Sequence, residues 1–296
     1  SSDKFMEKRD VTIIIPSYNR GHLLRKTVPT YLQERVAKIV LVDDCSSDDT
    51  TEVVEELRKE YPAIEYVRQP RNMRQTVAKN RGMEQVDTEW VYFGDDDSIL
   101  VPGTISELYE TAVKYCVDIV GARALYMRVG EDRLPLDEAM ARHFRETDDV
   151  KDIVDVAEIK ANFSLYISTP VKVPFCQACL LCRTEIAKKV GFDPNYIGNA
   201  YREETDFIIG CAKNGATVYY NAKGCQFNLP TNLATGGARG KSVWKYKWYM
   251  VRNNWYFLRK NYDFLKTEYH LKSNKYWVQL KFISGFFIRP LKRLFK

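Results

Sequence analysis

The sequence predicts an α/β fold in which a mostly parallel sheet is covered by helices on both faces. Short runs rich in β-branched residues alternate with helix-like segments, and the connections between them are short. At 296 residues, the chain is long enough to bury a large core. Its 45% hydrophobic and 28% charged residues are ordinary globular values, which exclude a collagen-like or wholly disordered chain.

Strands and helices are expected to alternate along the first 121 residues. Strands are predicted at short runs rich in β-branched and aromatic residues, at 11–15, 37–42, 64–67, 89–93 and 118–121. Helices are predicted where apolar residues recur at helical spacing, at 22–32, 49–60, 76–85 and 104–116. Pro29 predicts a break or kink in the first helix, and Ser46 or Ser47 is expected to cap the second.

Three acidic clusters follow predicted strands or open a predicted helix. They are Asp43–Asp49, Asp95–Asp97 and Glu203–Asp206. Taken singly, each has an ordinary explanation, since carboxylates favour the first turn of a helix and solvated turns. Ligands of such sheets bind at the carboxyl ends of the strands, where the first two clusters would lie. Their joint placement therefore indicates one functional site.

The cluster Asp95–Asp97 favours a divalent cation. Three consecutive carboxylates repel one another unless a cation or ligand compensates their charge. Hard oxygen ligands at a strand end suit Mg²⁺ or Mn²⁺, which keep several waters and share phosphate oxygens with a substrate.

Five segments of the chain match the motifs of a known family in the family's order. They are Ile15–Arg20 (IPSYNR), Val42–Asp48 (VDDCSSD), Arg71–Gly82 (RNMRQTVAKNRG), Asp95–Asp97 (DDD) and Glu203–Asp206 (EETD). With them the sequence resembles the inverting nucleotide-sugar glycosyltransferases of family two, which have the GT-A fold. The resemblance implies a catalytic domain over 1–240, with a nucleotide-sugar half at 11–121 and an acceptor half at 122–240.

The resemblance also implies roles in binding the donor. The third motif provides Lys79, which is expected at the diphosphate. Asp97 is expected to be the main metal ligand, with Asp95 as a second candidate for Mn²⁺ or Mg²⁺. The residues expected around the nucleoside are Pro16, Tyr18, Arg20, Asp44 for the base, and Asp95 or Asp96 for the ribose.

The reaction implied is displacement of a nucleoside diphosphate by an acceptor hydroxyl, with inversion at the anomeric carbon. Glu204 occupies the position of the family's general base, and Asp206 is the alternative. The donor is expected to be a UDP-sugar, and the acceptor a glycan or a lipid-linked glycan. A sugar nucleotidyltransferase is an alternative, but the loop after the first predicted strand lacks a glycine-rich phosphate cradle.

Two segments depart from the family pattern or extend it. Many relatives have a His after the base helix, whereas this chain has Gln226 and Asn228, which are weak substitutes. The stretch 236–240 is expected to be a loop that either closes over the donor, with Arg239 on the diphosphate, or serves as a plain linker.

The chain ends in a basic, aromatic region at 241–296, which is expected to be helical. It has fourteen Lys and Arg against two acids, and four of the five Trp. On a helical wheel Trp277, Leu280 and Ile283 begin an apolar arc, opposite to basic residues, and Pro290 predicts a kink. Residues 275–296 are therefore expected to contact an anionic membrane. Residues 244–260 favour packing on the catalytic domain.

The remaining features favour a cytoplasmic protein on the inner face of the membrane. Seven Cys form no disulfide-like framework, no apolar run reaches the ~18 residues of a spanning helix, and no signal peptide opens the chain. Cys176, Cys179 and Cys182 lack a fourth metal ligand and are interpreted as core residues. A nucleic-acid partner is not expected, because the first 240 residues are net acidic and show no such motif.

Overall fold

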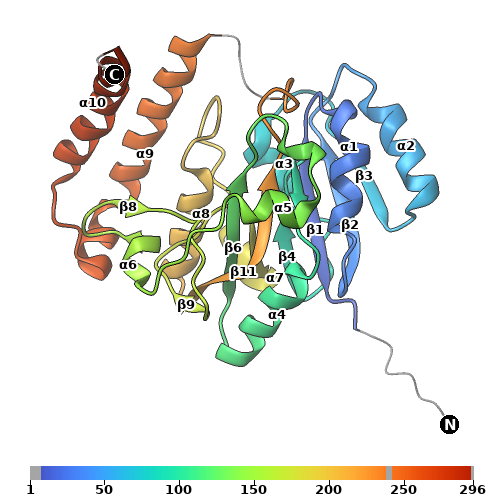
Figure 1. Cartoon of the computed structure of the whole chain (residues 1–296), viewed down its shortest axis with the longest axis horizontal. Coiled ribbons are helices and arrows are strands. Elements are labelled where there is room, and N and C mark those ends of the chain that lie inside the picture. Colours follow the sequence, from blue (N-terminus) through green and yellow to red (C-terminus); the bar gives the residue numbers. More distant parts are fainter. Residues whose placement is uncertain (1–7, 238–241, 295–296) are drawn as a thin grey trace.

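The computed structural model describes residues 8–237 and 242–294. A twisted central sheet runs through the molecule, with helices against both faces and two long helices at one end (Figure 1). The paired strands are β1 (Val11–Ser17), β2 (Val36–Asp43), β3 (Ile64–Arg68), β4 (Trp90–Phe93), β5 (Ser98–Leu100), β6 (Ile119–Tyr126), β9 (Val171–Lys172), β10 (Leu180–Arg183) and β11 (Val218–Asn228). The strands β7 (Val154–Asp155) and β8 (Lys160–Ala161) form a separate antiparallel pair.

The sheet order is β3-β2-β1-β4-β10-β6-β11-β5, with β9 paired to β11. Strands β1 to β4 pair in parallel, as do β6 and β11, whereas β10, β5 and β9 are antiparallel to their neighbours. The predicted mostly parallel α/β sheet is therefore confirmed. Because β1, β2 and β4 are parallel neighbours, their carboxyl ends meet at one edge.

The helices between the strands cover the sheet on both faces. They are α1 (Gly21–Thr27), α2 (Thr50–Glu60), α3 (Arg74–Met83), α4 (Thr104–Tyr115), α5 (Leu136–Ala141), α6 (Val150–Ile153), α7 (Thr184–Val190) and α8 (Glu203–Lys213), with 3₁₀ turns η1 (Val28–Tyr31) and η2 (Glu131–Arg133). Two core clusters lie on opposite faces of the sheet. Ile13 and Ile15 belong to one, and their neighbour Ile14 belongs to the other. Alternate residues of β1 therefore face opposite layers.

Of the two predictions made for the first two helices, one is confirmed and one is wrong. As predicted from Pro29, helix α1 ends at Thr27 and a 3₁₀ turn continues the chain. The expected cap of α2 was wrong. Neither Ser46 nor Ser47 caps this helix, because Asp48 accepts a hydrogen bond from the Thr50 amide at 3.1 Å. The Asp48 carboxylate thus satisfies a free amide in the first turn of the helix, as a capping serine would.

The helices α9 (Val243–Tyr269) and α10 (Lys275–Leu294) form one end of the molecule (Figure 1). The second half of α9 packs on the catalytic fold through Phe257 and Leu258, as expected for this segment. The first turns of α9 leave Trp244 and Trp248 exposed, whereas the buried side chain of Asn253 donates a hydrogen bond to the Ile197 carbonyl at 2.8 Å. Helix α10 continues past Pro290. Neither α9 nor α10, nor any other helix in the described ranges, has the apolar length that a membrane span requires.

Candidate active site

The predicted site residues gather at the carboxyl edge of the parallel strands. Arg20 follows β1, Asp44 follows β2, and Asp95–Asp97 follow β4. The guanidinium of Arg20 is buried and lies 3.3 Å from Asp96 and 3.2 Å from Asp97. Asp96 also accepts a hydrogen bond from the Ser17 hydroxyl at 2.9 Å. Two of the three aspartates are thus held by groups at the end of β1.

Asp95 is held from the other side, by β11. The side-chain amide of Gln226 donates a hydrogen bond to Asp95 at 2.9 Å, and the Tyr92 hydroxyl donates to Gln226 at 2.7 Å. Burial, and then the charge of Asp97, raises the pKa of Asp95 to about 7. Burial also raises the pKa of Asp96 to about 7, although Arg20 opposes this. The protein alone therefore leaves the negative charge of this cluster undercompensated.

A buried ion-pair group lies next to this cluster. Lys79 on α3 is 2% exposed, and its ammonium lies 2.7 Å from Glu203 and 3.1 Å from Glu204, the first residues of α8. Gln75 donates a further hydrogen bond to Glu204 at 3.3 Å. Burial lowers the pKa of Lys79, but the charges of Glu203 and Glu204 outweigh burial and raise it above its ordinary value. Lys79 therefore stays charged.

The two glutamates differ in exposure and in pKa. Burial and the charge of Glu204 raise the pKa of Glu203 to about 8, against the opposing effect of Lys79. One oxygen of Glu203 is buried without a hydrogen-bond partner among the described residues. Burial also acts to raise the pKa of Glu204, but Lys79 and the hydrogen bond to Glu203 lower it overall. The side chain of Glu204 is 28% exposed, so it is an ionised carboxylate that a substrate can reach.

Asp206, the alternative base, contacts a different part of the molecule. One of its oxygens accepts a hydrogen bond from Asn261 at 2.8 Å, and the other pairs with Lys260 at 2.9 Å. Both partners belong to α9. Asp206 therefore links α8 to α9, whereas Glu204 contacts Lys79.

The remaining residues expected around the nucleoside lie at the same edge. The carboxylate of Asp44 accepts hydrogen bonds from the amides of Met73 at 2.7 Å and Arg74 at 2.8 Å. Burial raises the pKa of Asp44 despite these bonds. Pro16 and Tyr18 are half-buried and flank Ser17, which pairs with Asp43 across the parallel strands β1 and β2. Arg239 lies outside the described residues.

No three His, Cys, Asp or Glu side chains in the described parts of the chain are grouped closely enough to form a ready metal site. Cys176, Cys179 and Cys182 are free, buried thiols whose pKa values are raised by burial, which agrees with their interpretation as core residues.

Several contacts in the site were not predicted from the sequence. The pairing of Lys79 with Glu203 joins residues 124 positions apart. Ser17 and Tyr31 also contact the aspartate cluster, with the Asp95 amide donating to the Tyr31 hydroxyl at 3.0 Å. Gln226 was considered only as a weak substitute for a histidine. Nothing local marks these residues, since their partners come from distant segments.

A family model described as "Glycosyl transferase family 2" matches residues 12–190. This match covers more than half of the chain, so the chain belongs to glycosyltransferase family 2. The membership confirms the family that the five motifs indicated. It also counts against the sugar nucleotidyltransferase alternative.

Curated relatives match only part of the chain. A GalNAc(5)-diNAcBac-PP-undecaprenol beta-1,3-glucosyltransferase of Campylobacter jejuni is 35% identical over 105 residues, which are 34% of this chain and 34% of that protein. The dolichyl-phosphate beta-glucosyltransferase ALG5A of Trichomonas vaginalis is 28% identical over 182 residues, which are 56% of this chain and 55% of that protein. The matches thus span about a third to a half of these relatives.

Solved structures are similar over more of the chain. TarS 1–349 of S. aureus, in complex with UDP-GlcNAc, has a TM-score of 0.58 at 15% identity and covers 88% of this chain and 74% of that one. The mannosyltransferase PcManGT of Pyrobaculum calidifontis, in complex with GDP-Man and Mn²⁺, has a TM-score of 0.57 at 16% identity, covering 87% and 65%. At these identities the likeness shows the GT-A fold alone, which is the predicted fold.

Proposed function

We propose that the protein is an inverting glycosyltransferase that moves a sugar from a nucleotide-sugar to a hydroxyl of a glycan or lipid-linked glycan. One observation supports this most strongly. Glu204 and Lys79 lie close enough to Asp95 for their charges to act on its pKa. A carboxylate that could act as the base therefore adjoins the aspartates that would bind the diphosphate through a cation.

Glu204 is the general base in this proposal. It is ionised and accessible, whereas Glu203 is buried and both oxygens of Asp206 are occupied by α9. As the acceptor oxygen attacks the anomeric carbon, its proton passes to Glu204 and a new carbon–oxygen bond forms. The bond to the diphosphate breaks, and the nucleoside diphosphate leaves with the electron pair. A single displacement inverts the anomeric carbon and needs no carboxylate nucleophile.

Lys79 is a positioning residue in this scheme. The family resemblance implied that Lys79 contacts the diphosphate, but its ammonium is buried between Glu203 and Glu204. A diphosphate contact would require this ion pair to break. Lys79 instead orients Glu204 and keeps it ionised.

The aspartate cluster suits Mn²⁺ or Mg²⁺. Its carboxylate oxygens are hard donors, and the raised pKa of Asp95 indicates charge that a cation would compensate. Asp97, with Asp95, would hold the ion, and the remaining ligands would be diphosphate oxygens and water, since the described residues form no complete site. A bound cation would neutralise the charge that develops on the leaving diphosphate.

The donor is proposed to be a UDP-sugar. TarS, whose fold is similar, was solved with UDP-GlcNAc, whereas PcManGT was solved with GDP-Man, so the fold admits both nucleotides. Support for a lipid-linked acceptor comes from the Campylobacter relative, whose name specifies a PP-undecaprenol substrate. The exposed aromatic residues of α9 and α10 support contact with an anionic membrane.

The experiment that tests this function compares Glu204→Gln with Asp206→Asn. Sugar transfer from UDP- and GDP-sugars is measured with and without Mn²⁺, and nucleotide affinity is measured by thermal shift. Glu204→Gln should lower transfer by about 10²-fold or more and leave nucleotide affinity unchanged. Asp206→Asn should act mainly on stability. Full transfer by Glu204→Gln would contradict the assignment of the base.

A further inference from the structure

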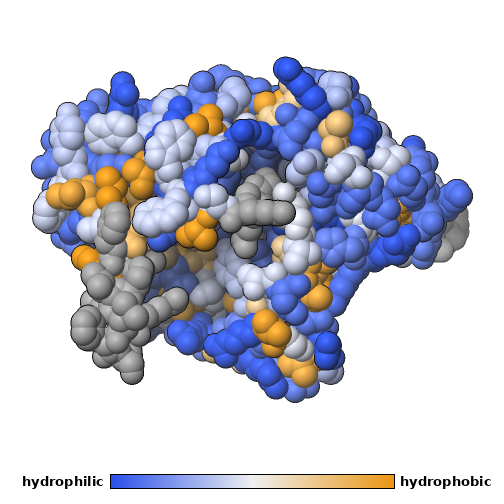
Figure 2. Space-filling model, turned by 90° about the horizontal axis from the view of Figure 1, so that it is seen from above, coloured by the Kyte–Doolittle hydropathy of each residue, from blue (hydrophilic) through white to orange (hydrophobic). Residues whose placement is uncertain are grey.

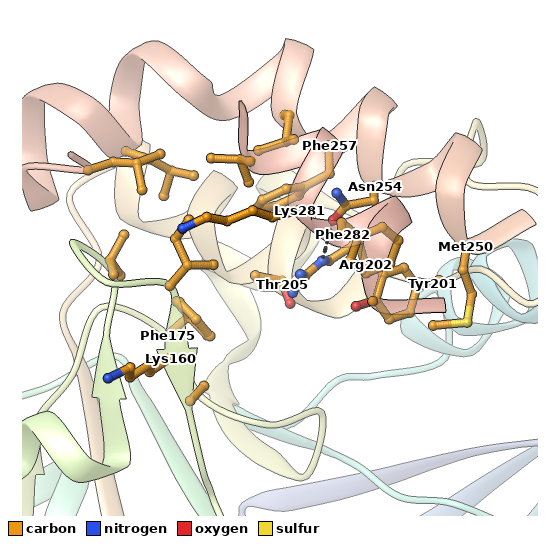
Figure 3. A pocket seen from close by; sticks show the side chains of 18 of the residues that line it. Lys160, Phe175, Tyr201, Arg202, Thr205, Met250, Asn254, Phe257, Lys281 and Phe282 are labelled. Carbon is orange, nitrogen blue, oxygen red and sulfur yellow. Dashed lines mark hydrogen bonds between the residues drawn. The ribbon is translucent and has the colours of Figure 1, made fainter. Parts of the chain in front are cut away.

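A large apolar cavity lies between α9, α10 and the β7–β8 pair. Its volume is about 990 Å³, which is at the upper end for small-molecule sites. We call it the α9–α10 pocket. Apolar side chains from three segments form most of its wall, among them Phe175, Phe257, Leu258, Leu265, Val278 and Phe282 (Figure 3). A cavity with such a wall suits a flexible hydrocarbon chain.

Basic side chains also line the pocket. Lys160, Lys247, Lys281 and Arg202 are among its lining residues, against one acid, Asp155. Within the described part of the chain, none of the four cations has a carboxylate within 4.0 Å. Figure 3 shows Arg202 between Thr205 and Asn254, to which it donates a hydrogen bond at 3.0 Å. An apolar cavity with unpaired cations is complementary to an amphiphile with an anionic head.

The pocket adjoins the proposed catalytic base. Arg202 and Thr205 line it, and they flank Glu203 and Glu204 in sequence at the start of α8. An anionic head bound near Arg202 would therefore lie at the helix end that carries Glu204.

The other side of the pocket adjoins an exposed apolar surface. Trp277 and Leu280 are 49% and 55% exposed, on the face of α10 opposite to Val278 and Phe282. Figure 2 shows apolar side chains gathered at this end of the molecule, beside a hollow in the surface. A bilayer bound at this surface would therefore be separated from the pocket by α10 alone.

We propose that the α9–α10 pocket binds the isoprenoid chain and phosphate groups of a lipid-linked acceptor, an inference that rests on the proposed function. The apolar wall holds the chain, and the cations hold the phosphate or diphosphate. The sugar hydroxyl attached to that head then reaches Glu204. The pocket thus selects acceptors by their lipid carrier.

Gly285 offers a way to fill the pocket without disturbing the fold. It lines the cavity, and a Cβ added there would meet no atom within 4 Å. Gly285→Phe would therefore occupy the space of the lipid chain. Ser284→Phe is the matched control, because it adds the same ring to the preceding residue of α10, which does not line the pocket.

The probe is farnesyl diphosphate, a soluble isoprenoid diphosphate, and its affinity for the full chain is measured by calorimetry without nucleotide. Gly285→Phe should weaken binding by about tenfold or more, whereas Ser284→Phe should leave it unchanged. The double variant Lys160→Glu/Lys281→Glu should weaken farnesyl diphosphate and spare farnesol. Inorganic diphosphate should bind more weakly than farnesyl diphosphate.

Two results would overturn the proposal. One is equal affinity of wild type and Gly285→Phe for farnesyl diphosphate, and the other is equal binding of inorganic diphosphate and farnesyl diphosphate. Because the assay contains no nucleotide and no transfer step, failure here leaves the proposed transfer reaction standing. Failure of Glu204→Gln to impair transfer would, conversely, leave isoprenoid binding intact.

Discussion

Lys79 is a buried ammonium between Glu203 and Glu204, and its charge acts on the pKa of both glutamates. Its ammonium lies 2.7 Å from Glu203, which burial keeps protonated, and 3.1 Å from ionised Glu204, so the first contact is a hydrogen bond and the second an ion pair. Removing one partner of such a group leaves an uncompensated buried charge. The chemical state of the proposed base therefore depends on a residue that does not itself meet the substrate.

Lys79→Met tests this positioning role. Without the ammonium, the pKa of Glu204 should rise, so the acidic limb of the pH–rate profile should move to higher pH. Transfer at neutral pH should fall by about a hundredfold. Lys26→Met, which removes a half-exposed lysine on α1, should leave the profile in place. A lower rate with an unmoved profile would show that Lys79 acts on folding alone.

Glu203→Gln tests whether the buried side chain of Glu203 is protonated in the folded protein. The pKa of Glu203 is raised from 4.5 to about 8, so the folded state keeps a proton that the unfolded chain releases at lower pH. The stability from this group is complete below pH 4.5 and is lost as pH rises through 8. The Tm of Glu203→Gln relative to wild type should therefore increase between about pH 5 and about pH 9. Glu185→Gln, an exposed control on α7, should show a constant difference. Parallel curves for Glu203→Gln would contradict the raised pKa.

At the scale of elements, the site depends on how loops meet strand ends. The loop after β11 reaches the end of β1, where a Cβ on Gly237 would lie 2.4 Å from a guanidinium nitrogen of Arg20. Gly237 has φ +71, a conformation that side chains rarely adopt. The glycine therefore lets the loop pack against the cation that holds Asp96 and Asp97.

Gly237→Ala should displace Arg20 and weaken nucleotide-sugar binding by about tenfold, as judged by titration calorimetry. It should also lower the free energy of unfolding by about 1–2 kcal/mol, because alanine is strained at a positive φ. Gly215→Ala is the matched control, because Gly215 has φ +85 and a Cβ there would meet nothing within 4 Å. The control should lose stability without losing affinity. Equal affinity of both variants would rule out the coupling to Arg20.

At the scale of the whole molecule, the surface of the C-terminal helices is distinctive. The end formed by α9 and α10 presents exposed aromatic residues in a region with fourteen basic residues and two acids. This composition suits the interface of an anionic bilayer. The α9–α10 pocket lies between this proposed membrane surface and the start of α8, which carries Glu204.

The double variant Trp277→Ser/Leu280→Ser should reduce flotation with anionic vesicles and have little effect with neutral ones, because it removes apolar anchors and keeps the basic residues. Val113→Ser/Val129→Ser provides the control, since these valines are 54% and 70% exposed on other elements. Flotation that is equal for both double variants would refute membrane contact through α10.

Much of the fold and part of the site were predictable because their signals are local. The strand at 89–93 and the aspartates after it lie next to each other in sequence, so the end of β4 could be predicted together with its chemistry. The family motifs likewise indicated Glu204. Neighbouring residues in the sequence could not decide between Glu204 and Asp206 as the base. The partners of Asp206, Asn261 and Lys260, come from the distant helix α9.

The sequence by itself determined the α/β class, the carboxylates of the site and the amphipathic character of the C-terminal region, since each depends on neighbours within a few residues. Only the tertiary structure decided that Lys79 pairs with Glu203 and Glu204, that Gln226 holds Asp95, and that α9 and α10 enclose a pocket. These features join segments up to 131 residues apart, and such contacts arise from the packing of whole elements rather than from any local pattern.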